Sequence, residues 1–276
     1  MPSQPTAGAG APDPACLVSQ LEREFALADD PLERIRQALE EGAFALLAQP
    51  ILALRGEERF PMAEVLVRLR EEELALLPPG EFFRVFEHYD MMPELDRWVL
   101  RHTIAQLARG CAVPRLSINV SGQTLADAGF PAAVGAELAG AGVSASALVF
   151  EIAESDALGR SREAGRFAAE LRALGSAVAL DGFGQLAASF ALLREIPTDF
   201  VKVDGAVVRR LRASDAARAR LRAVVRVGAV LGFGVIAECV EDAETLERVR
   251  ESGAHYAQGF GVRRPEPVAT VAEARF

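Results

Sequence analysis

The chain has 276 residues, of which 50% are hydrophobic and 25% charged, and its formal net charge is −9. This composition is that of a globular protein with a sizeable core, and it excludes collagen-like, disulfide-scaffold and wholly disordered chains. The negative charge argues against DNA or RNA as the main partner, because binding a nucleic-acid backbone requires a basic face. It leaves room for a small nucleotide that is held by a few placed groups.

The N-terminal residues predict no targeting signal. Residues 1–14 are rich in Pro, Ala and Gly and are interpreted as a flexible tail, without a basic region followed by an apolar stretch. The longest apolar run, residues 227–237, is far shorter than the ~18 residues that a membrane span needs. The 3 cysteines are far apart and fit a reducing compartment. We therefore expect a cytoplasmic protein with no membrane association.

Two helices are predicted between residues 15 and 42. Apolar residues follow Cys16 at helical spacing, and Asp30 and Pro31 form an N-cap and the first position of a second helix. We interpret residues 15–42 as a helical lead-in and residues 43–276 as one barrel domain. The apolar stripe of the lead-in either packs on the barrel or meets a second copy or a sensor protein.

From residue 43 onward, predicted strands alternate with predicted helices. Residues 44–54 and 62–70 predict two strands close in sequence, and hence an antiparallel pair. Short apolar strands follow at 115–121, 148–155, 177–181, 199–204, 234–238 and 255–260, and helices are predicted at 81–90, 94–110, 131–140, 162–175, 189–196, 206–232 and 244–253. Interior strands that are apolar on both faces indicate a buried parallel sheet and an α/β fold. The pattern favours a (β/α)8 TIM-type barrel with one antiparallel strand over the alternative, an open doubly-wound sheet.

Polar side chains recur at the C-terminal ends of these strands. In a barrel those ends meet on one face, which is where active sites are built. Lys202 is the only lysine and Asn119 the only asparagine of the chain, which is explained either by codon bias or by a need for an ammonium at 202 and a carboxamide at 119. Taken singly, each position is also explained by a strand end that meets water, but the set as a whole is not. Its members are Glu64, Asn119, Glu151, Asp181, Lys202, Asp204, Glu238 and Gln258.

The donor types in this set indicate divalent-metal chemistry. Carboxylates and a carboxamide offer hard oxygen ligands, which suit Mg²⁺ or Mn²⁺ better than zinc. So many acids would repel an anionic phosphate unless cations lie between protein and ligand. The lysine would orient a water or meet a phosphate. The histidines, His88, His102 and His255, form no ligand set.

The order of these residues resembles the EAL domain family. The resemblance runs from about residue 44 to about residue 267, and it implies a barrel that binds cyclic di-GMP. Active members hydrolyse that dinucleotide to the linear form, pGpG, with Mg²⁺ or Mn²⁺. The matching motifs are Gln49 to Ile51, Glu64 to Arg68, Asn119 to Ser121, Glu151 to Glu154, Asp181 to Gly184, Lys202 to Asp204, Ala237 to Glu241 and Gln258 to Phe260.

Carried over position by position, the resemblance implies a role for each matching residue. A first metal ion would be held by Glu64, Asn119, Glu151 and Asp181, with Glu238 completing its shell. Lys202 would position the attacking water, and Gln258 would line the same pocket. Glu154 would anchor the loop after Asp181. Gln49 would contact a guanine and Arg68 a phosphate, which suits the planar donor geometry of arginine.

One departure from the family pattern bears on catalysis. Gly182 stands where the family has a second aspartate, and that acid helps to hold a second metal ion. Since a two-metal site clamps both the attacking and the leaving oxygen, its loss predicts one bound ion and much slower hydrolysis. Asp204 is the candidate for partial compensation. The loop at 185–190 also departs from the family pattern.

Three functions therefore remain open. The first is a cyclic di-GMP receptor, a degenerate member that passes a signal to an effector or sensor protein in trans or to a second copy in a homodimer. The second is an active metal-dependent phosphodiesterase, which the retained lysine and remaining acids favour. The third is an interaction module that has lost the nucleotide, against which Gln49 and Arg68 count. Turnover and binding assays separate the three.

Overall fold

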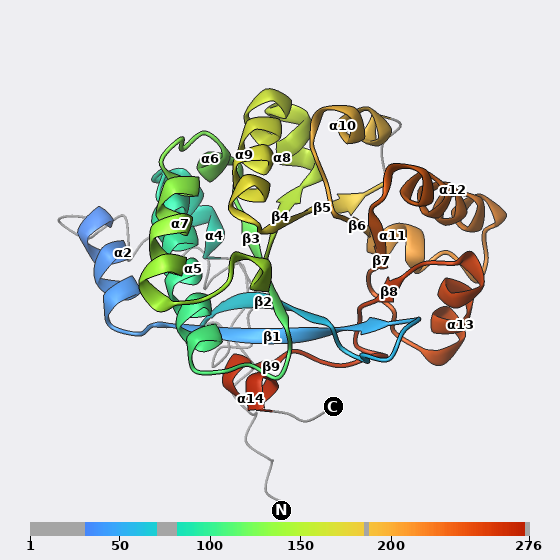
Figure 1. Ribbon diagram of the computed structural model, residues 1–276, viewed down its shortest axis with the longest axis horizontal. Coiled ribbons are helices and arrows are strands. Elements are labelled where there is room, and N and C mark those ends of the chain that lie inside the picture. The colour runs from blue at the N-terminus through green and yellow to red at the C-terminus, as the bar shows by residue number, and fades with distance from the viewer. Residues whose placement is uncertain (1–30, 71–81, 185–187, 274–276) are drawn as a thin grey trace, which may run out of the picture.

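A computed structural model describes residues 31–70, 82–184 and 188–273 of the chain (Figure 1). Within them one closed sheet runs in the order β2-β3-β4-β5-β6-β7-β8-β1-β9, and β1 also pairs with β2 and so completes the ring. A closed ring rules out the open doubly-wound alternative. The strands are β1 (Phe44–Ala53), β2 (Met62–Leu69), β3 (Arg115–Val120), β4 (Leu148–Ala153), β5 (Ala177–Phe183), β6 (Phe200–Val203), β7 (Gly234–Ala237), β8 (Tyr256–Ala257) and β9 (Glu266–Pro267).

Strand β1 is the antiparallel member of the barrel, as the sequence predicts. It pairs antiparallel with β2, β8 and β9, whereas the pairs from β2–β3 through β7–β8 are parallel. In the β1–β2 register, Gln49 lies opposite Glu64. This register brings two of the sequence-predicted site residues to the same height of the barrel.

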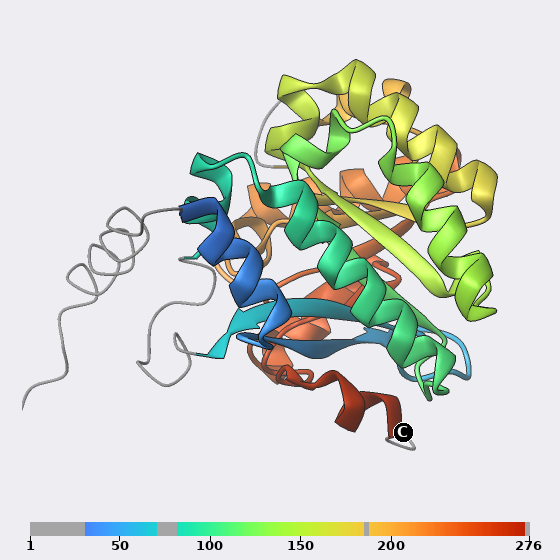
Figure 2. The ribbon, with the colours of Figure 1, turned by 90° about the vertical axis from the view of Figure 1, so that its left-hand side faces the viewer.

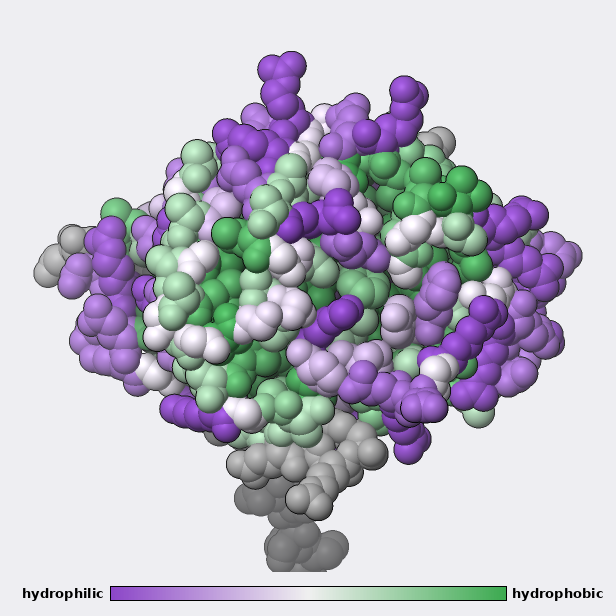
Figure 3. Space-filling view, in the orientation of Figure 1, coloured by the Kyte–Doolittle hydropathy of each residue, from purple (hydrophilic) through white to green (hydrophobic). Residues whose placement is uncertain are grey.

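Helices surround the parallel part of the sheet, and Figure 1 shows α12 and α13 on one side and α5 and α7 on the other. Figure 3 shows hydrophilic residues over the edge that carries α12 and α13. The helical segments are α2 (Pro31–Glu40), α4 (Phe83–His88), α5 (Met92–Ala108), α6 (Gly122–Leu125), α7 (Phe130–Ala141), η1 (Ala145–Ala147), α8 (Glu154–Gly159), α9 (Ser161–Leu174), α10 (Ser189–Glu195), α11 (Gly205–Val208), α12 (Asp215–Leu231), α13 (Ala243–Ser252) and α14 (Val268–Glu273).

Three of the predicted elements differ from the structure. The helix predicted over 206–232 is two helices, α11 and α12, because the Ser214 hydroxyl accepts a hydrogen bond from the Ala217 amide and starts a new helix there. The strand predicted over 148–155 ends at Ala153, where α8 begins. The strand predicted over 255–260 is only β8, since the chain turns at Gly259, whose carbonyl accepts hydrogen bonds from the Val262 and Arg263 amides.

The two-residue period of the strands sorts the barrel interior into layers. One layer is apolar and consists of Ile51, Met62, Val149, Ala179, Phe200 and Ile236. Two residues later come Glu64, Glu151, Asp181 and Lys202 on β2, β4, β5 and β6, and Glu238 directly after β7. On β1, which runs the other way, Gln49 comes two residues before Ile51. The polar layer therefore lies toward the C-terminal ends of the parallel strands, above a hydrophobic floor.

Of the predicted lead-in, residues 15–42, the structure describes α2 and the turn after it. Helix α2 lies alongside α5 (Figure 2), where the Trp98 indole donates a hydrogen bond of 2.9 Å to the Leu39 carbonyl. The predicted tail at 1–14 and the first predicted helix lie outside the described residues, so the domain boundaries stay predictions. Among the helices that the structure describes, none combines the length and the apolar character of a bilayer span.

Candidate functional site

Lys202 is the centre of the polar layer. Its side chain is 1% exposed, and its Nζ lies 2.6 Å from Glu151 Oε2 and 2.8 Å from Glu64 Oε2. Glu238 Oε1 and Asp181 Oδ1 lie 3.2 and 3.5 Å from the same nitrogen. Four carboxylates, three on strands and that of Glu238 directly after β7, thus converge on one ammonium, and Glu64 lies 138 positions from Lys202 in the chain. We call Lys202, Glu64, Glu151, Asp181 and Glu238 the acid cluster.

Carboxamides complete the hydrogen bonding of Glu64. Asn119 Nδ2 donates to Glu64 Oε1 at 3.0 Å, and Gln258 Nε2 donates to Glu64 Oε2 at 2.7 Å. Gln258 Nε2 also lies 3.2 Å from Gln49 Oε1, and Gln49 Nε2 donates to the Arg263 carbonyl at 2.9 Å. Sequence-predicted residues from β1, β2, β3 and the end of β8 therefore form one connected network around a single carboxylate.

The protonation of the acid cluster follows from burial and charge. Burial alone would lower the pKa of Lys202, but the surrounding carboxylates outweigh it and raise that pKa well above its ordinary value. Burial would raise the pKa of Glu64, but the ammonium and the carboxamide hydrogen bonds lower it. Burial and the charge of Glu64 raise the pKa of Glu151 to about 8. Burial likewise raises the pKa of Glu238. These directions favour a charged ammonium and an ionised Glu64 at neutral pH, with Glu151 protonated.

The donor set fits a divalent cation. Four carboxylates and one ammonium leave an excess of three negative charges when every acid is ionised. Asp181 Oδ1 is buried and accepts no hydrogen bond from the described residues, with the Lys202 ammonium 3.5 Å away, and a carboxylate oxygen is a hard ligand of the kind that Mg²⁺ and Mn²⁺ prefer. The carboxylates gather around the ammonium, and no three acidic, histidine or cysteine side chains in the described ranges are already arranged as a metal site.

Gly182 occupies a corner of the site that is open. Its φ of +68° lies in the left-handed region, and a Cβ built there would have Asp204 Oδ2 at 4.0 Å as its nearest neighbour. Asp204 Oδ1 accepts a 2.6 Å hydrogen bond from the Ala206 amide and so caps α11. The second oxygen of Asp204 thus faces the position where a side chain on residue 182 would begin.

Glu154 ties together the two ends of the loop that follows β5. Its carboxylate accepts hydrogen bonds from the Gly184 amide and the Ser189 hydroxyl, which lie on either side of residues 185–187. Burial raises the pKa of this carboxyl. The sequence-predicted partner of this loop is therefore adjacent to it, while Gln185 to Ala187 lie outside the described residues.

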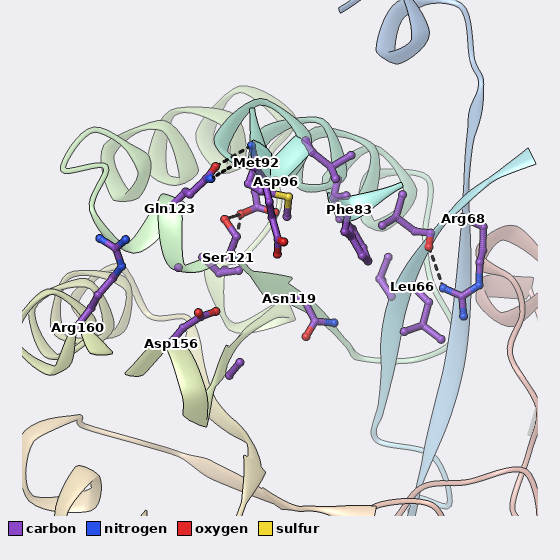
Figure 4. Close-up of a pocket in the computed structure, with 18 residues that line it drawn as sticks. Leu66, Arg68, Phe83, Met92, Asp96, Asn119, Ser121, Gln123, Asp156 and Arg160 are labelled. Carbon is purple, nitrogen blue, oxygen red and sulfur yellow. Dashed lines mark hydrogen bonds between the residues drawn. The ribbon is translucent and has the colours of Figure 1, made fainter. Parts of the chain in front are cut away.

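A pocket of about 600 Å³ is lined in part by Asn119 (Figure 4), whose side chain donates a hydrogen bond to Glu64 of the acid cluster. This volume lies within the ~300–1,000 Å³ range of small-molecule sites. Arg68 lines one wall, where its Nη1 donates to the Val67 carbonyl at 2.8 Å. Apolar walls come from Leu66 and Phe83, and the polar residues at the other end include Asp96, Ser121, Gln123, Asp156 and Arg160.

Sequence reasoning missed Asp96, which holds the far wall of this pocket. Asp96 on α5 is 6% exposed, and its Oδ2 accepts hydrogen bonds from the Ser121 amide, the Ser121 hydroxyl and the Thr124 hydroxyl, at 2.9, 2.8 and 2.7 Å. Burial raises its pKa to about 6. An acid on the buried face of an amphipathic helix was the available signal. Through Ser121, Asp96 fixes the turn that follows Asn119.

Comparison with known proteins identifies a family whose sequence model matches most of the chain. The EAL domain model matches residues 32–265 of the chain. The cyclic di-GMP phosphodiesterase PdeB of Shewanella oneidensis is 33% identical over 243 residues, which cover 87% of this chain and 28% of that protein. An uncharacterized protein of Mycobacterium tuberculosis is 35% identical over 243 residues, which cover 85% of this chain and 79% of that protein.

Solved structures agree with these sequence matches. The EAL domain of FimX from Pseudomonas aeruginosa, in a crystal structure with bound c-di-GMP, superposes with a TM-score of 0.80 at 29% identity and covers 88% of this chain and 98% of that domain. The chain spans only 28%, 33% and 41% of the length of three relatives named as cyclic di-GMP phosphodiesterases.

Proposed function

The chain belongs to the EAL domain family, the family of cyclic di-GMP phosphodiesterases, and from this membership we propose that it binds cyclic di-GMP at the C-terminal rim of its barrel. The observation that carries the proposal is the convergence of four carboxylates on the buried Lys202 ammonium, next to a pocket of nucleotide size. We further propose that the chain acts mainly as a receptor, in a reducing cytoplasm where its described thiols, Cys111 and Cys239, stay unpaired.

The ligand would lie across the acid cluster and into the pocket. Arg68 on the pocket wall would pair with a phosphate, and Asn119 stands where pocket and cluster meet. Gln49 donates a hydrogen bond to the Arg263 carbonyl, and Gln258 donates to Gln49 and Glu64. These two side chains would therefore stabilise the hydrogen-bond network as well as contact a guanine base. Arg68 is positively charged and the acid cluster is negatively charged, so a phosphate would lie between the Arg68 guanidinium and a cation held by the cluster.

A divalent cation would be held by Glu64, Asn119, Glu151 and Asp181, with Glu238 beside them, and would supply Lewis-acid stabilisation of phosphate oxygens and activation of water. Lys202 holds the carboxylates of Glu64 and Glu151 in place and remains protonated, so it would donate a hydrogen bond to the water that attacks phosphorus. Glu151 and Glu238, whose pKa values are raised, would release protons as the cation enters.

The receptor proposal rests on residue 182. A glycine there contributes no oxygen to a second cation, and a site with one cation clamps either the attacking or the leaving oxygen but not both. The acid cluster itself keeps all its members, so ligand affinity and the first cation are retained in this proposal. Binding without rapid turnover follows.

Hydrolysis is the second candidate, and Asp204 favours it. One Asp204 oxygen faces the open corner at Gly182, 4.0 Å from the built Cβ, and is free of the capping bond that engages the other oxygen. A cation in that corner would need Asp204 to stand in for the absent carboxylate. The buried, ionised Lys202 also has a clear part in turnover and a less evident one in binding alone.

Two assays separate these functions. Calorimetric titration of cyclic di-GMP measures binding, which we expect for the wild type, with at least tenfold weaker binding for Arg68→Ala. Arg248→Ala, which removes an exposed arginine of α13 far along the chain, is the control. Chromatography after incubation with Mn²⁺ measures turnover, which the receptor proposal expects to be very slow. Rapid formation of pGpG that Lys202→Ala abolishes would favour hydrolysis, and no binding at all would leave an interaction module.

The Gly182→Asp variant tests whether the missing carboxylate at residue 182 is the cause of slow hydrolysis. Aspartate is among the side chains that tolerate a left-handed φ, and the atom nearest to the built Cβ is Asp204 Oδ2 at 4.0 Å. If the missing carboxylate limits hydrolysis, Gly182→Asp raises the turnover rate by at least tenfold, and Gly182→Asn, with the same shape but no charge, does so much less. Equal rates for all three proteins would place the defect in the loop at 185–190.

A further inference from the structure

Helix α12 differs from the other long helices in its charge. It carries four arginines and one acid, Asp215 in its first turn, although the chain as a whole has a net charge of −9. The other long helices mix the two signs: α5 has two arginines and two acids, α9 has three and two, and α13 has two and three. Helix α11 and the turn after it, residues 205–214, add three arginines and no acid. Positive charge is therefore concentrated in one part of an acidic protein.

The central arginines of α12 lie on the face of the helix opposite the barrel. The face that packs on the barrel is buried and consists of Ala217, Leu221, Val224 and Gly228. Arg222 and Arg226 are both exposed and lie one helical turn apart on the other face. Figure 1 shows α12 at the outer edge of the molecule, and Figure 3 shows hydrophilic residues over that edge.

The guanidiniums of Arg222 and Arg226 are available to a partner. The acids near this part of the chain are engaged elsewhere, since Asp215 pairs with Arg218 and two acids near α13 pair with Arg212. Within the described ranges, no carboxylate forms an ion pair with Arg222 or Arg226. The structure thus presents two unpaired charges about 6 Å apart, the spacing of side chains at i and i+4 on a helix.

The surface around this pair also has the shape of a contact surface. Ala219 is exposed beside the arginines and leaves room for close approach, and Val230, one turn after Arg226, is 83% exposed. A hollow of about 270 Å³ at the start of α12 is lined by Arg210 and Arg220. Exposed apolar side chains rimmed by polar ones are typical of interaction sites. We call Arg210, Arg220, Arg222, Arg226 and Val230 the basic face.

Charge complementarity favours an acidic protein partner for the basic face. A helix with carboxylates at i and i+4 would match the spacing of Arg222 and Arg226. A lipid surface is a poorer fit, because an interfacial helix needs a continuous apolar face and α12 exposes large apolar side chains only at its end, Val230 and Leu231. A second copy in a two-fold contact would place arginine against arginine. A nucleic-acid backbone would be repelled by the acidic remainder of the chain.

We propose that the basic face is a docking surface for an acidic helix of a partner protein, with Arg222 and Arg226 as the central contacts. This surface is separate from the acid cluster and from the pocket lined by Asn119. The proposal does not depend on the binding of cyclic di-GMP, so the two can fail independently.

The test measures binding of a fluorescent, alanine-based helical peptide with a glutamate at every fourth residue, by anisotropy with the full chain and no nucleotide. The wild type should bind the peptide, and added NaCl should weaken binding because it screens exposed charges. The double variant Arg222→Glu/Arg226→Glu should bind about tenfold or more weakly, since two attractions become repulsions. Arg222→Gln/Arg226→Gln should lose affinity to a smaller extent, and it supplies the measurement if the reversed variant does not fold.

The double variant Arg162→Glu/Arg166→Glu is the matched control, because it reverses two exposed arginines four residues apart on α9. It should bind the peptide as the wild type does, and circular dichroism should show every variant folded. A wild type that does not bind the peptide, or an equal loss of affinity in the α9 control, would overturn the proposal. Tighter binding to phosphatidylglycerol vesicles or to duplex DNA than to the peptide would also overturn it, as would a homodimer in sedimentation that Arg222→Glu/Arg226→Glu dissociates.

Discussion

Replacement of Lys202 by methionine tests whether the acid cluster is a single electrostatic unit. Lys202→Met preserves the length and the packing of the side chain and removes the ammonium. It leaves Glu64 and Glu151, at 10% and 1% exposure, without the cation that lies 2.8 and 2.6 Å from their oxygens. Because these two carboxylates lie above an apolar floor, solvent has little access to them to replace the lost charge.

The magnitude follows from those distances. At an effective dielectric constant of ~20, one unit-charge pair 2.8 Å apart attracts with ~6 kcal/mol, and desolvation of each ion offsets several kcal/mol of it. Removal of one partner from such a buried pair costs about 3–5 kcal/mol in the free energy of unfolding. In a chain of this size the loss corresponds to a fall in Tm on the order of 10 °C.

The pH dependence has a definite sign. Without the ammonium, the pKa of Glu64 is no longer lowered and rises with burial, as that of Glu151 already does. An acid whose pKa is raised in the folded state holds a proton that the unfolded chain has released, so stability falls as the pH rises through that window. The penalty of Lys202→Met should therefore be larger at pH 8 than at pH 6, and Mn²⁺ should recover part of it at pH 8.

Urea denaturation at both pH values, with and without Mn²⁺, measures the effect. Arg248→Ala breaks an exposed ion pair with Glu251 on α13 and should cost less than about 1 kcal/mol. Addition of Glu151→Gln to Lys202→Met should restore stability, because one unpaired charge is then gone. A Lys202→Met protein as stable as the wild type at pH 8 without metal would refute the electrostatic account of the cluster.

Three further predictions concern the surroundings of the cluster. Asp96→Ala leaves the Ser121 amide and the Thr124 hydroxyl without an acceptor, so it should lower the free energy of unfolding by about 2–4 kcal/mol, and a loss below 1 kcal/mol in urea denaturation would contradict the description of that turn. Because burial raises the pKa of Glu151 to about 8, Mn²⁺ should raise the Tm more at pH 8 than at pH 6 in scanning calorimetry, and equal shifts would count against cation binding at the cluster. Glu154→Gln should speed amide hydrogen exchange at Gly184, as followed by mass spectrometry, whereas unchanged exchange would mean that the carboxylate does not hold that loop.

Much of the barrel and of the acid cluster can be predicted from the sequence. Strand periodicity and the parallel register place the polar residues at strand ends on one face, so the set around Lys202 follows once a barrel is assumed. The sole lysine and the sole asparagine were the sharpest signal, and the structure brings both into contact with Glu64. Their roles toward metal and nucleotide stay predictions.

Contacts between residues on elements far apart in the sequence could not be predicted in the same way. Nothing in the helix predicted at 94–110 indicates that Asp96 would hold Ser121, and nothing near Gly122 indicates a neighbour at Asp156, because neither pair has a shared period or motif. The split of 206–232 into two helices had a local signal, a serine followed by an acid at Ser214, that the apolar periodicity on both sides obscured.

The most direct measurement is a crystal structure of the chain grown with cyclic di-GMP and Mn²⁺, with anomalous scattering data at the manganese edge. We expect one strong manganese peak among Glu64, Asn119, Glu151 and Asp181, with a ligand phosphate between that peak and Arg68. A dinucleotide bound away from the rim, or an acid cluster that still closes around Lys202 with no manganese in it, would contradict the account.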